Sequence, residues 1–591
     1  MSPLRTAVRT WGPKAHDAEA SRGLAAHLEV PAPVAALLWQ RGQRTVEAAQ
    51  SFLNPSLLDL HPPEVIADLE RAVEQIFDAK ERGIPICIYG DYDVDGVTGS
   101  VILLEALAEL GVEARSYIPH RLDEGYGLNL DAVRTLHAEG IGLLITVDGG
   151  ANDHAELALA SELGMAVIVT DHHPIEGGLA DIPIVHPGRA HPDRKDSPSP
   201  SATLCGAGVA YKLAWGLGKR AAEGDRVAPR FRSFLEEALA LLALGTVADV
   251  VPLLGENRAI VSHGLRALGR SSRPGLRALL EVCALEPDRL TSTDIGFKIG
   301  PHLNAAGRMG QVERAVELLR TRDAARGRAV ALELATLNRQ RKAIEQKMID
   351  DCLEELEGDL HPRGGSALLF ARLGWHSGVA GIVAARLVDR LSRPVFVVAL
   401  DGEIGRGSAR SIEERPLTDL YDAVRPLALS IGGHACAGGL TIAPDQVEQV
   451  RAALASAGEA RGETEELPPK EYDLAIPGEE ATLELVRALA AMAPFGAGNP
   501  EPIFRIEGLS LARPPRLVGR GEEHLMAQFR HDAGTIEAIW FRGAEHAGEL
   551  IRQDHAAPGT ISVIAVLSED RFRGVSRLRA RVIDLIRSPS L

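Results

Sequence analysis

The chain has 591 residues, 45% of them hydrophobic and 25% charged, which indicates a globular protein with several domains. No window suits a membrane span, and the N-terminus lacks the apolar centre of a signal peptide, so we expect a cytoplasmic protein without a membrane partner. Five scattered cysteines exclude a disulfide framework and a zinc–thiolate site. The net charge of −17 does not exclude a polyanionic partner, because binding depends on the local field and residues 301–346 and 505–581 are slightly basic.

The first 265 residues predict a small helical segment followed by a doubly wound α/β domain. Residues 1–60 predict short helices at 34–39 and 46–53, separated by prolines. In residues 61–265, apolar strands alternate with helices, which is typical of a parallel sheet. The expected strands are 84–89, 141–146, 166–170 and 182–185.

The rest of the chain predicts a helical connector and two further domains. Residues 266–360 form the connector, with a long helix between 311 and 359 that bridges two domains. Residues 361–465 repeat an αβ pattern: a strand at 367–370, a helix at 381–391, a strand at 395–398 and then glycine-rich turns. Five short strands in residues 466–591 suggest a β-barrel of the oligonucleotide-binding (OB) kind. The predicted fold is therefore two α/β domains joined by a long helix, plus a C-terminal OB-fold barrel.

An acidic motif follows the strand expected at 84–89. In IYGDYDVDG, three aspartates alternate with other residues and Gly96 closes the motif: Asp91, Asp93 and Asp95. An extended backbone would place the three carboxylates on one side, and Gly96 would permit a sharp turn into a helix beginning near Val97. Such carboxylates repel one another unless a divalent cation lies between them, and ligands bind at this end of parallel strands. A solvated acidic turn is the alternative.

Three more motifs place acidic or histidine side chains at the ends of strands or helices. They are Asp148 in TVDGG, His172 in TDHHP and Asp249 in GTVADVVPL. Each residue alone could be a helix cap. Together with the aspartate motif they could hold two ions about 3.5–4 Å apart that jointly activate a water molecule. Mixed carboxylate and imidazole ligands favour Mn²⁺ or Mg²⁺ over Ca²⁺.

These four motifs, in this order and spacing, resemble the DHH phosphoesterase superfamily. The segments GWHSGVAGIVAARL, GRGSARS and GGHACAGG are similar to the DHH-associated domain of that superfamily. LCGAGVAYKL, IGPHLNAAGRM and APFGAGNPEPIF, with the N-terminal segment and the barrel, resemble the RecJ family of bacterial single-strand-specific DNA exonucleases. The resemblance covers almost the whole chain. Two departures are VDGG, where relatives more often have asparagine or cysteine third, and His186, where relatives commonly have asparagine.

The resemblance implies a set of metal ligands and catalytic groups. Two metals would be bound by Asp93, Asp95, Asp148, His172 and Asp249, with Asp91 a direct or indirect ligand. Of these, Asp148 and His172 would also count as catalytic. His173 would donate a hydrogen bond to the phosphate or to the leaving oxygen. A histidine that only satisfies a structural hydrogen bond is the alternative for His173.

The resemblance also implies contacts with DNA. In the second α/β domain, Ser408, Arg410 and the amides around His434 would bind a terminal 5′ phosphate together with Arg121, because a dianionic end favours an arginine cluster. Alternatively, GRGSARS is a plain hairpin turn and Arg121 a solvated charge. Asn304 and Arg308 would contact the backbone of the incoming strand or brace the junction between domains.

Aromatic and basic side chains could add affinity for single strands. Phe495 and Tyr126 could stack on bases, although packing in a core is the commoner fate of a lone aromatic residue. The barrel would contribute salt-sensitive contacts through five arginines: Arg513, Arg516, Arg520, Arg571 and Arg573.

The resemblance therefore implies a metal-dependent 5′-to-3′ exonuclease that degrades single-stranded DNA to mononucleotides in recombination and repair. We expect a monomer that works with a single-strand-binding protein and a helicase. One alternative is a DHH phosphodiesterase for short oligonucleotides, cyclic dinucleotides or pyrophosphate, which would need neither the barrel nor the N-terminal segment. The other is a non-catalytic single-strand-binding scaffold, which would have no reason to keep mutually repelling carboxylates.

Overall fold

The computed structural model describes residues 10–120, 124–125, 127–189, 199–222, 224, 226–357, 367–461, 468–556, 559, 561–572 and 575–586. The chain divides into two compact units. The first contains Leu60–Val251 and His263–Leu467, and the second contains Arg9–Asp59, Pro252–Ser262 and Pro468–Leu591. The first unit carries all four acidic and histidine motifs.

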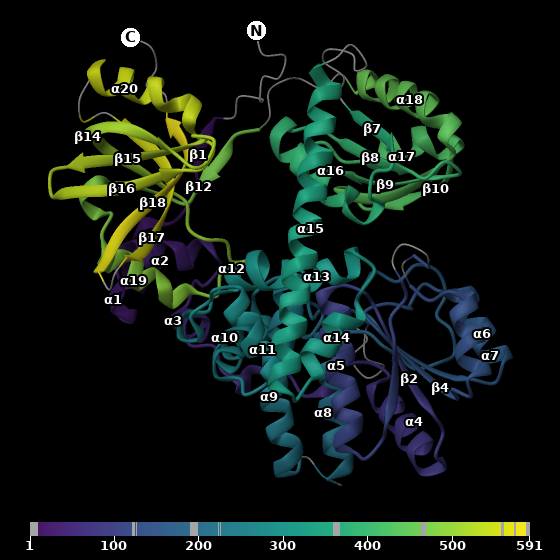
Figure 1. Cartoon of the computed structure of the whole chain (residues 1–591). Coiled ribbons are helices and arrows are strands. Elements are labelled where there is room, and N and C mark those ends of the chain that lie inside the picture. Colours follow the sequence, from purple (N-terminus) through teal and green to yellow (C-terminus); the bar gives the residue numbers. More distant parts are fainter. Residues whose placement is uncertain are drawn as a thin grey trace. The chain divides into compact units, whose positions relative to one another are not determined.

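A parallel five-stranded sheet forms the first part of this unit (Figure 1). Its strands lie in the order β3-β2-β4-β5-β6, with bounds Ala114–Tyr117, Ile86–Gly90, Leu143–Val147, Ala166–Thr170 and Ile184–Val185. β2 and β4 are buried along their whole length, as expected of central strands in a parallel sheet. The predicted sheet is confirmed, with β3 as an additional edge strand.

Helices cover both faces of this sheet. α6 (Leu130–Ala138) and α7 (His154–Glu162) share one hydrophobic core with β2, β4 and β5. α5 (Val94–Glu109) and α8 (Gly206–Ala221) lie against each other and contact β4, and α9 (Pro229–Ala248) packs on both helices. α4 (Leu69–Arg82) packs on α8. The carboxyl ends of the strands remain as the edge at which the motif loops meet.

A helical region connects the parallel sheet to the second α/β part of the unit. It comprises α10 (Gly255–Arg270, shared between the units), α11 (Pro274–Val282), α12 (Ser292–Asp294), α13 (Gly300–Arg308), α14 (Glu313–Arg320) and α15 (Ala324–Glu357). α15 is one continuous helix of 34 residues, which confirms the predicted long connector. The cap expected at Gly358 lies outside the described residues.

The second α/β part contains a mixed five-stranded sheet. Its order is β10-β11-β9-β8-β7, with bounds Ala428–Gly433, Ala437–Ile442, Gly405–Arg410, Val395–Leu400 and Leu368–Leu373. The helices are α16 (Ser377–Leu391), α17 (Thr418–Val424) and α18 (Val447–Ala460).

The GRGSARS segment is a strand and not the hairpin turn that was one reading of its glycines. β9 lies between β8 and β11 and is antiparallel to both. Its glycines are needed for close packing: a Cβ at Gly407 would lie 2.6 Å from the carbonyl oxygen of Val397. The turn reading was therefore wrong, because glycine here accommodates neighbouring strands instead of reversing the chain.

The second unit is a closed β-barrel with an N-terminal helical segment packed into it. The barrel strands are β14 (Phe504–Val518), β15 (His524–His531), β16 (Gly534–Trp540), β17 (Ile561–Phe572) and β18 (Val575–Ile586), and pairing of β14 with β17 closes it. β13 (Leu474–Pro477) extends the sheet beside β14, and β1 (Trp11–Pro13) pairs with β12 (Lys470–Tyr472). The remaining helices are α1 (Ala18–Leu28), α2 (Ala32–Gln40), α3 (Val46–Leu53), α19 (Leu483–Leu489) and α20 (Ala547–Ala556).

The N-terminal segment and the barrel share one hydrophobic core. Leu37 and Leu38 of α2 belong to the same buried cluster as Phe504 and Phe529 of the barrel. The sequence assigned these segments to separate domains, a division that remains a prediction, but their apolar side chains pack together as one core.

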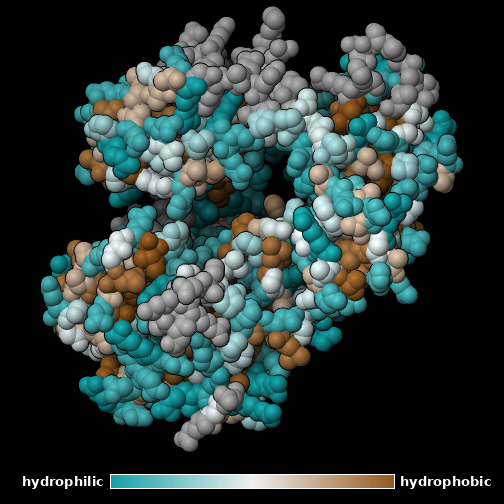
Figure 2. All heavy atoms as spheres, turned by 180° about the vertical axis from the view of Figure 1, so that it is seen from behind, coloured by the Kyte–Doolittle hydropathy of each residue, from teal (hydrophilic) through white to brown (hydrophobic). Residues whose placement is uncertain are grey.

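Hydrophobic residues on the face drawn in Figure 2 form separate patches among hydrophilic ones. Within the described part of the chain, none of the helices combines the length and the hydrophobicity that a membrane crossing requires.

Candidate metal centre and substrate contacts

The aspartate motif bends into a helix earlier than expected. β2 ends at Gly90 and α5 already begins at Val94, so the backbone is not extended through the motif. Asp93 is the N-cap of α5, and its carboxylate accepts hydrogen bonds from the amides of Asp95 (2.8 Å) and Gly96 (3.1 Å). The prediction of one common side for three alternating carboxylates was therefore wrong.

Gly96 has a different role from the predicted turn. It lies within the first turn of α5, and a Cβ there would lie only 2.6 Å from the Cβ of Asp91. Glycine is required because the helix start presses against the buried Asp91.

Asp95 binds the start of another helix. Its carboxylate accepts hydrogen bonds from the amides of Gly206 (2.6 Å) and Ala207 (3.0 Å), the first residues of α8. A Cβ on Gly206 would lie 2.6 Å from the Cβ of Asp148, so this glycine lets α8 approach both acids. The LCGAGVAYKL motif thus supports the acidic site through its backbone.

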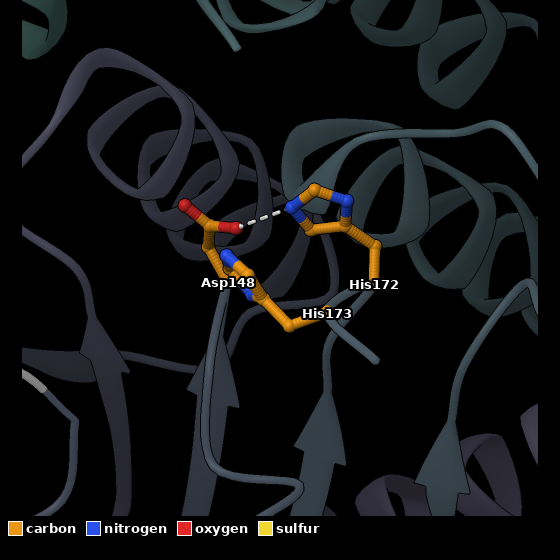
Figure 3. A group of neighbouring side chains, drawn as sticks. All are labelled: Asp148, His172 and His173. Atoms are coloured by element: carbon orange, nitrogen blue, oxygen red, sulfur yellow. Dashed lines mark ion pairs between the residues drawn. The ribbon is translucent and has the colours of Figure 1, made fainter. Parts of the chain in front are cut away.

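The other motif residues come from β4, β5 and α9. Asp148 directly follows β4 in the left-handed region at φ 64°, His172 lies two residues beyond β5, and Asp249 is the C-cap of α9. The Nε2 atom of His172 lies 3.1 Å from Asp148 Oδ1, 3.6 Å from Asp249 Oδ2 and 4.0 Å from Asp95 Oδ2. Figure 3 shows the His172 ring pointing at Asp148, with His173 beside them.

These side chains form overlapping groups whose ligand atoms lie within 4.8 Å of one another. One group contains Asp91, Asp93 and Asp148, and another contains Asp95, His172 and Asp249. Asp148 and His172 also approach each other directly and form a third group with His173. All six predicted metal-ligating residues therefore meet at one edge of the sheet.

The electrostatics of the site are unfavourable without a cation. Burial, followed by the charge of Asp95, raises the pKa of Asp148 well above its usual range. Burial and the neighbouring Asp95 and Asp93 raise the pKa of Asp249 to about 8, while burial and His173 lower that of His172 to about 4. Several acids and a neutral imidazole are thus enclosed together.

Two buried atoms in particular fit a metal ion. Asp148 Oδ1 and His172 Nε2 have no hydrogen-bond partner among the described residues, although they lie 3.1 Å apart. Two cis ligands at about 2.1 Å from an octahedral ion are separated by about 3 Å. The donor atoms, their burial and this spacing fit Mn²⁺ or Mg²⁺.

His173 is oriented by Asp171, to which the sequence assigned no role. Asp171 Oδ1 accepts hydrogen bonds from the amides of His172 (2.7 Å) and His173 (3.0 Å) and from the Nδ1 of His173 (2.8 Å). Asp171 raises the pKa of His173 above its ordinary value, against the effect of burial. The neighbouring TDHHP carboxylate was the available signal, since aspartate commonly binds the amides that follow it.

Asn304 and Arg308 make contacts that brace the site. Asn304 Oδ1 accepts a hydrogen bond from the Val94 amide at the start of α5 (3.1 Å). Arg308 donates to the carbonyl of Gly378 in the first turn of α16 (3.2 Å). These contacts support the bracing alternative, and binding of DNA by the two residues remains a prediction.

Ser408 and Arg410 lie on β9 beside the first turns of α16. A Cβ on Gly381 would lie 3.0 Å from Arg410 Nη2 and 3.3 Å from Ser408 Oγ, so both polar groups border this helix. His434 lies in the β10–β11 hairpin, and its amide donates to Ala437, the residue that faces Arg410 across β9 and β11. Arg121 lies outside the described residues, so its place relative to these groups stays a prediction.

Among the candidate stacking and barrel residues, outcomes differ. Phe495 is partly buried and packs against the core of the second unit, whereas Tyr126 lies outside the described residues. Arg571 pairs with Glu569, and Arg573 lies outside the described residues. Three arginines of β14 and the following turn are exposed and form no ion pair within the described chain: Arg513, Arg516 and Arg520.

Three segments of the chain match sequence models of known domain families. They are the DHH family N-terminal domain at residues 85–246, the DHHA1 domain at 365–459 and the RecJ OB domain at 472–584. These matches coincide with the parallel sheet, the mixed sheet and the barrel.

Full-length comparisons lead to the same family. The single-stranded-DNA-specific exonuclease RecJ of Bacillus subtilis is 34% identical over 97% of this chain and 70% of its own length. The RecJ of Thermus thermophilus is 34% identical over 96% of this chain and 77% of its own. The crystal structure of Thermus thermophilus RecJ with Mn²⁺ matches with a TM-score of 0.81 and 31% identity, covering 100% of this chain and 81% of that one. The chain therefore belongs to the RecJ family of the DHH superfamily.

Proposed function

We propose that this protein is a metal-dependent exonuclease that removes mononucleotides from the 5′ end of single-stranded DNA, in recombination and repair. The proposal depends on one observation: carboxylates and an imidazole from four separate segments converge in groups within 4.8 Å. The relatives named single-stranded-DNA-specific exonuclease, and solved RecJ structures containing Mn²⁺ or Mg²⁺, support this assignment.

The acidic site would hold two divalent ions, Mn²⁺ or Mg²⁺. Asp91, Asp93 and Asp148 would bind one ion, and Asp95, His172 and Asp249 the other. When bound, such ions lower the pKa of a water molecule and neutralise charge on the phosphate oxygens. The chain keeps the ligands in place through the amides that bind Asp93 and Asp95.

His173 would handle the proton of the leaving oxygen. Because Nδ1 is bonded to Asp171, a proton exchanged with the substrate would pass through Nε2. The raised pKa of His173 supports a protonated ring that can donate to the phosphate or to the leaving oxygen.

Polarity would come from the second α/β part of the unit. Ser408, Arg410 and His434, with Arg121, would bind the terminal 5′ phosphate, which carries more charge than an internal phosphodiester. The exposed arginines of β14 would add sequence-independent contacts to the strand behind the cleaved end.

The alternatives are less well supported. A phosphodiesterase for small substrates needs no OB barrel, yet residues 472–584 match one. A non-catalytic scaffold has no need for buried acids whose pKa values are raised by their neighbours. We further propose a monomer in the cytoplasm, where all five cysteines stay as the free thiols that the structure contains, working with a single-strand-binding protein and a helicase.

One digestion experiment tests this function. Single-stranded DNA, duplex DNA and RNA, each labelled at the 5′ or 3′ end, are incubated with Mn²⁺, Mg²⁺ or chelator. We expect 5′-labelled single-stranded DNA to release labelled mononucleotide at once, and only with metal. Release from the 3′ end first, or equal digestion of duplex, would contradict the proposal.

A further inference from the structure

His186 is a buried histidine next to the candidate catalytic loop. It directly follows β6, and only 6% of its surface is exposed. Its Nε2 atom lies 2.7 Å from the backbone carbonyl oxygen of His173, and its Nδ1 atom lies 3.0 Å from the amide nitrogen of Gly188. Neither the metal ligands nor the proposed DNA contacts include this residue.

The two contacts fix the tautomer of the His186 ring. A backbone N–H can only donate, so Nδ1 must accept the hydrogen bond from Gly188 and carries no proton. In a neutral imidazole the proton then resides on Nε2, which donates to the His173 carbonyl. The ring is therefore a rigid link between two backbone groups.

His173 is consequently held from two sides. Its ring and amide are bound by Asp171, and its carbonyl is bound by His186. The loop that follows is held separately, since Asn152 donates to the carbonyl of Pro174 and accepts from the amide of Glu176. Only His186 therefore restrains the peptide between His173 and Pro174 from the β6 side among these contacts.

We propose that His186 is a positioning residue that aims the His173 ring at the leaving oxygen of the substrate. The inference rests on the proposed nuclease function. It identifies a departure from the family sequence, histidine in place of the common asparagine, as the hydrogen-bond donor that fixes the catalytic loop in this chain.

The test compares His186→Gln with His186→Phe in the full-length protein with Mn²⁺. Glutamine can keep a donor near the position of Nε2, whereas phenylalanine keeps a ring without any donor. For single-stranded DNA, we expect kcat to fall about 10- to 100-fold in the phenylalanine variant, as for other outer partners of catalytic groups. The glutamine variant should stay within about threefold of wild type, and KM and Mn²⁺ affinity should change less than about twofold in both, since no ligand is touched.

A second substrate separates positioning from a general loss of structure. Thymidine 5′-(p-nitrophenyl phosphate) releases p-nitrophenolate, which leaves without needing a proton. The phenylalanine variant should therefore lose less than about threefold in kcat on this ester. Equal losses on both substrates, or a lowered melting temperature with unchanged kcat on DNA, would overturn the proposal.

The tautomer itself can be measured in the wild-type protein should the phenylalanine variant not fold. Selective ¹⁵N-histidine labelling with Mg²⁺, and assignment by the glutamine variant, should give His186 a protonated Nε2 and an unprotonated Nδ1. A protonated Nδ1 would refute the inference. A wild-type protein that cleaves neither substrate would instead refute the proposed function.

Discussion

Asp148 occupies the left-handed backbone region, with φ 64°, where the ligand groups meet. Asparagine tolerates this conformation and keeps the side-chain volume, whereas alanine would add backbone strain. Asp148→Asn should abolish cleavage of single-stranded DNA, because the carboxylate charge is lost, while binding of the same strand measured by fluorescence anisotropy stays within about twofold.

The matched control is Asp181→Asn, which makes the same chemical change at a fully exposed side chain in the same unit. This variant should keep wild-type activity. Loss of both cleavage and binding in Asp148→Asn would indicate misfolding, and retained cleavage would contradict the role of Asp148.

The acids also predict how stability depends on pH without metal. Burial and neighbouring carboxylates raise the pKa of Asp95 to about 6 and of Asp249 to about 8, above about 4 for unfolded chains. Their stabilising protonation is complete below about pH 4 and is lost as the pH rises through 6 and 8. Chelator-treated protein should therefore melt at lower temperature at pH 8 than at pH 6, and Mn²⁺ should remove most of the difference. Equal melting temperatures without metal would contradict this electrostatic account.

At the residue scale, the sequence could predict which side chains bind metal but not how they group. The identity of the ligands follows from acids and histidines at strand ends. Their grouping depends on where α5 begins, and the N-cap at Asp93 moves that start to Val94. Hydrogen bonds to carboxylates, such as those to Asp171, depend on distances that no spacing in the sequence encodes.

Within α5, a buried ion pair anchors the helix that carries Asp95. Glu105 accepts two hydrogen bonds from Arg273 (2.8 and 2.5 Å), and Arg273 is only 2% exposed. Glu105→Gln should lower the free energy of unfolding by about 3 to 5 kcal/mol, because a buried guanidinium loses its counter-charge. Urea denaturation measures this effect.

The control for this prediction is Glu74→Gln, which breaks an exposed pair with Arg220 and should cost less than about 1 kcal/mol. Similar small losses in both variants would show that the buried pair is not an anchor.

β9 carries the prediction about the 5′ end. Arg410→Ala should reduce the preference for 5′-phosphorylated over 5′-hydroxyl strands, measured as the ratio of kcat/KM values, because the dianionic end loses its arginine. Arg425→Ala, at an exposed arginine of the same sheet region, should leave the ratio unchanged. A ratio unaffected by Arg410→Ala would remove this residue from the phosphate site.

At the scale of elements, buried strands could be predicted and polar ones could not. β4 and β5 are apolar runs, and their positions were anticipated within two residues. β3 reads ARSY, lies at the sheet edge and is only partly buried, so it lacks an apolar signal. β9 was misread because its glycines answer to packing against Val397 and not to local turn geometry.

For the whole molecule, the shared core of the second unit determines how the barrel can be tested. Deleting residues 468–591 would expose Leu37, Leu38 and their neighbours, so such a truncation would confound loss of DNA binding with unfolding. Charge reversal at the exposed Arg513 and Arg516 avoids this problem.

The double variant Arg513→Glu/Arg516→Glu should bind long single strands more weakly, with a less steep dependence on salt by roughly one counterion per lost phosphate contact. Turnover on short oligonucleotides should change little. An equal loss on short and long strands would exclude the barrel as an accessory binding surface.

Contacts between distant parts of the chain could not be anticipated. Arg41 donates to Asn499 (2.7 Å) and Arg258 to Ala493 (2.8 Å), across hundreds of residues. The APFGAGNPEPIF motif was identified from its resemblance, but its role in binding these arginines depends on tertiary packing alone.

The central claim is that separate acidic and imidazole side chains converge on a pair of divalent ions. Anomalous diffraction from crystals soaked in Mn²⁺ tests it most directly. We predict two manganese peaks in contact with Asp148 or His172, one also ligated by Asp93 and the other by Asp249. No peak at these residues, or a single peak ligated elsewhere, would contradict the account.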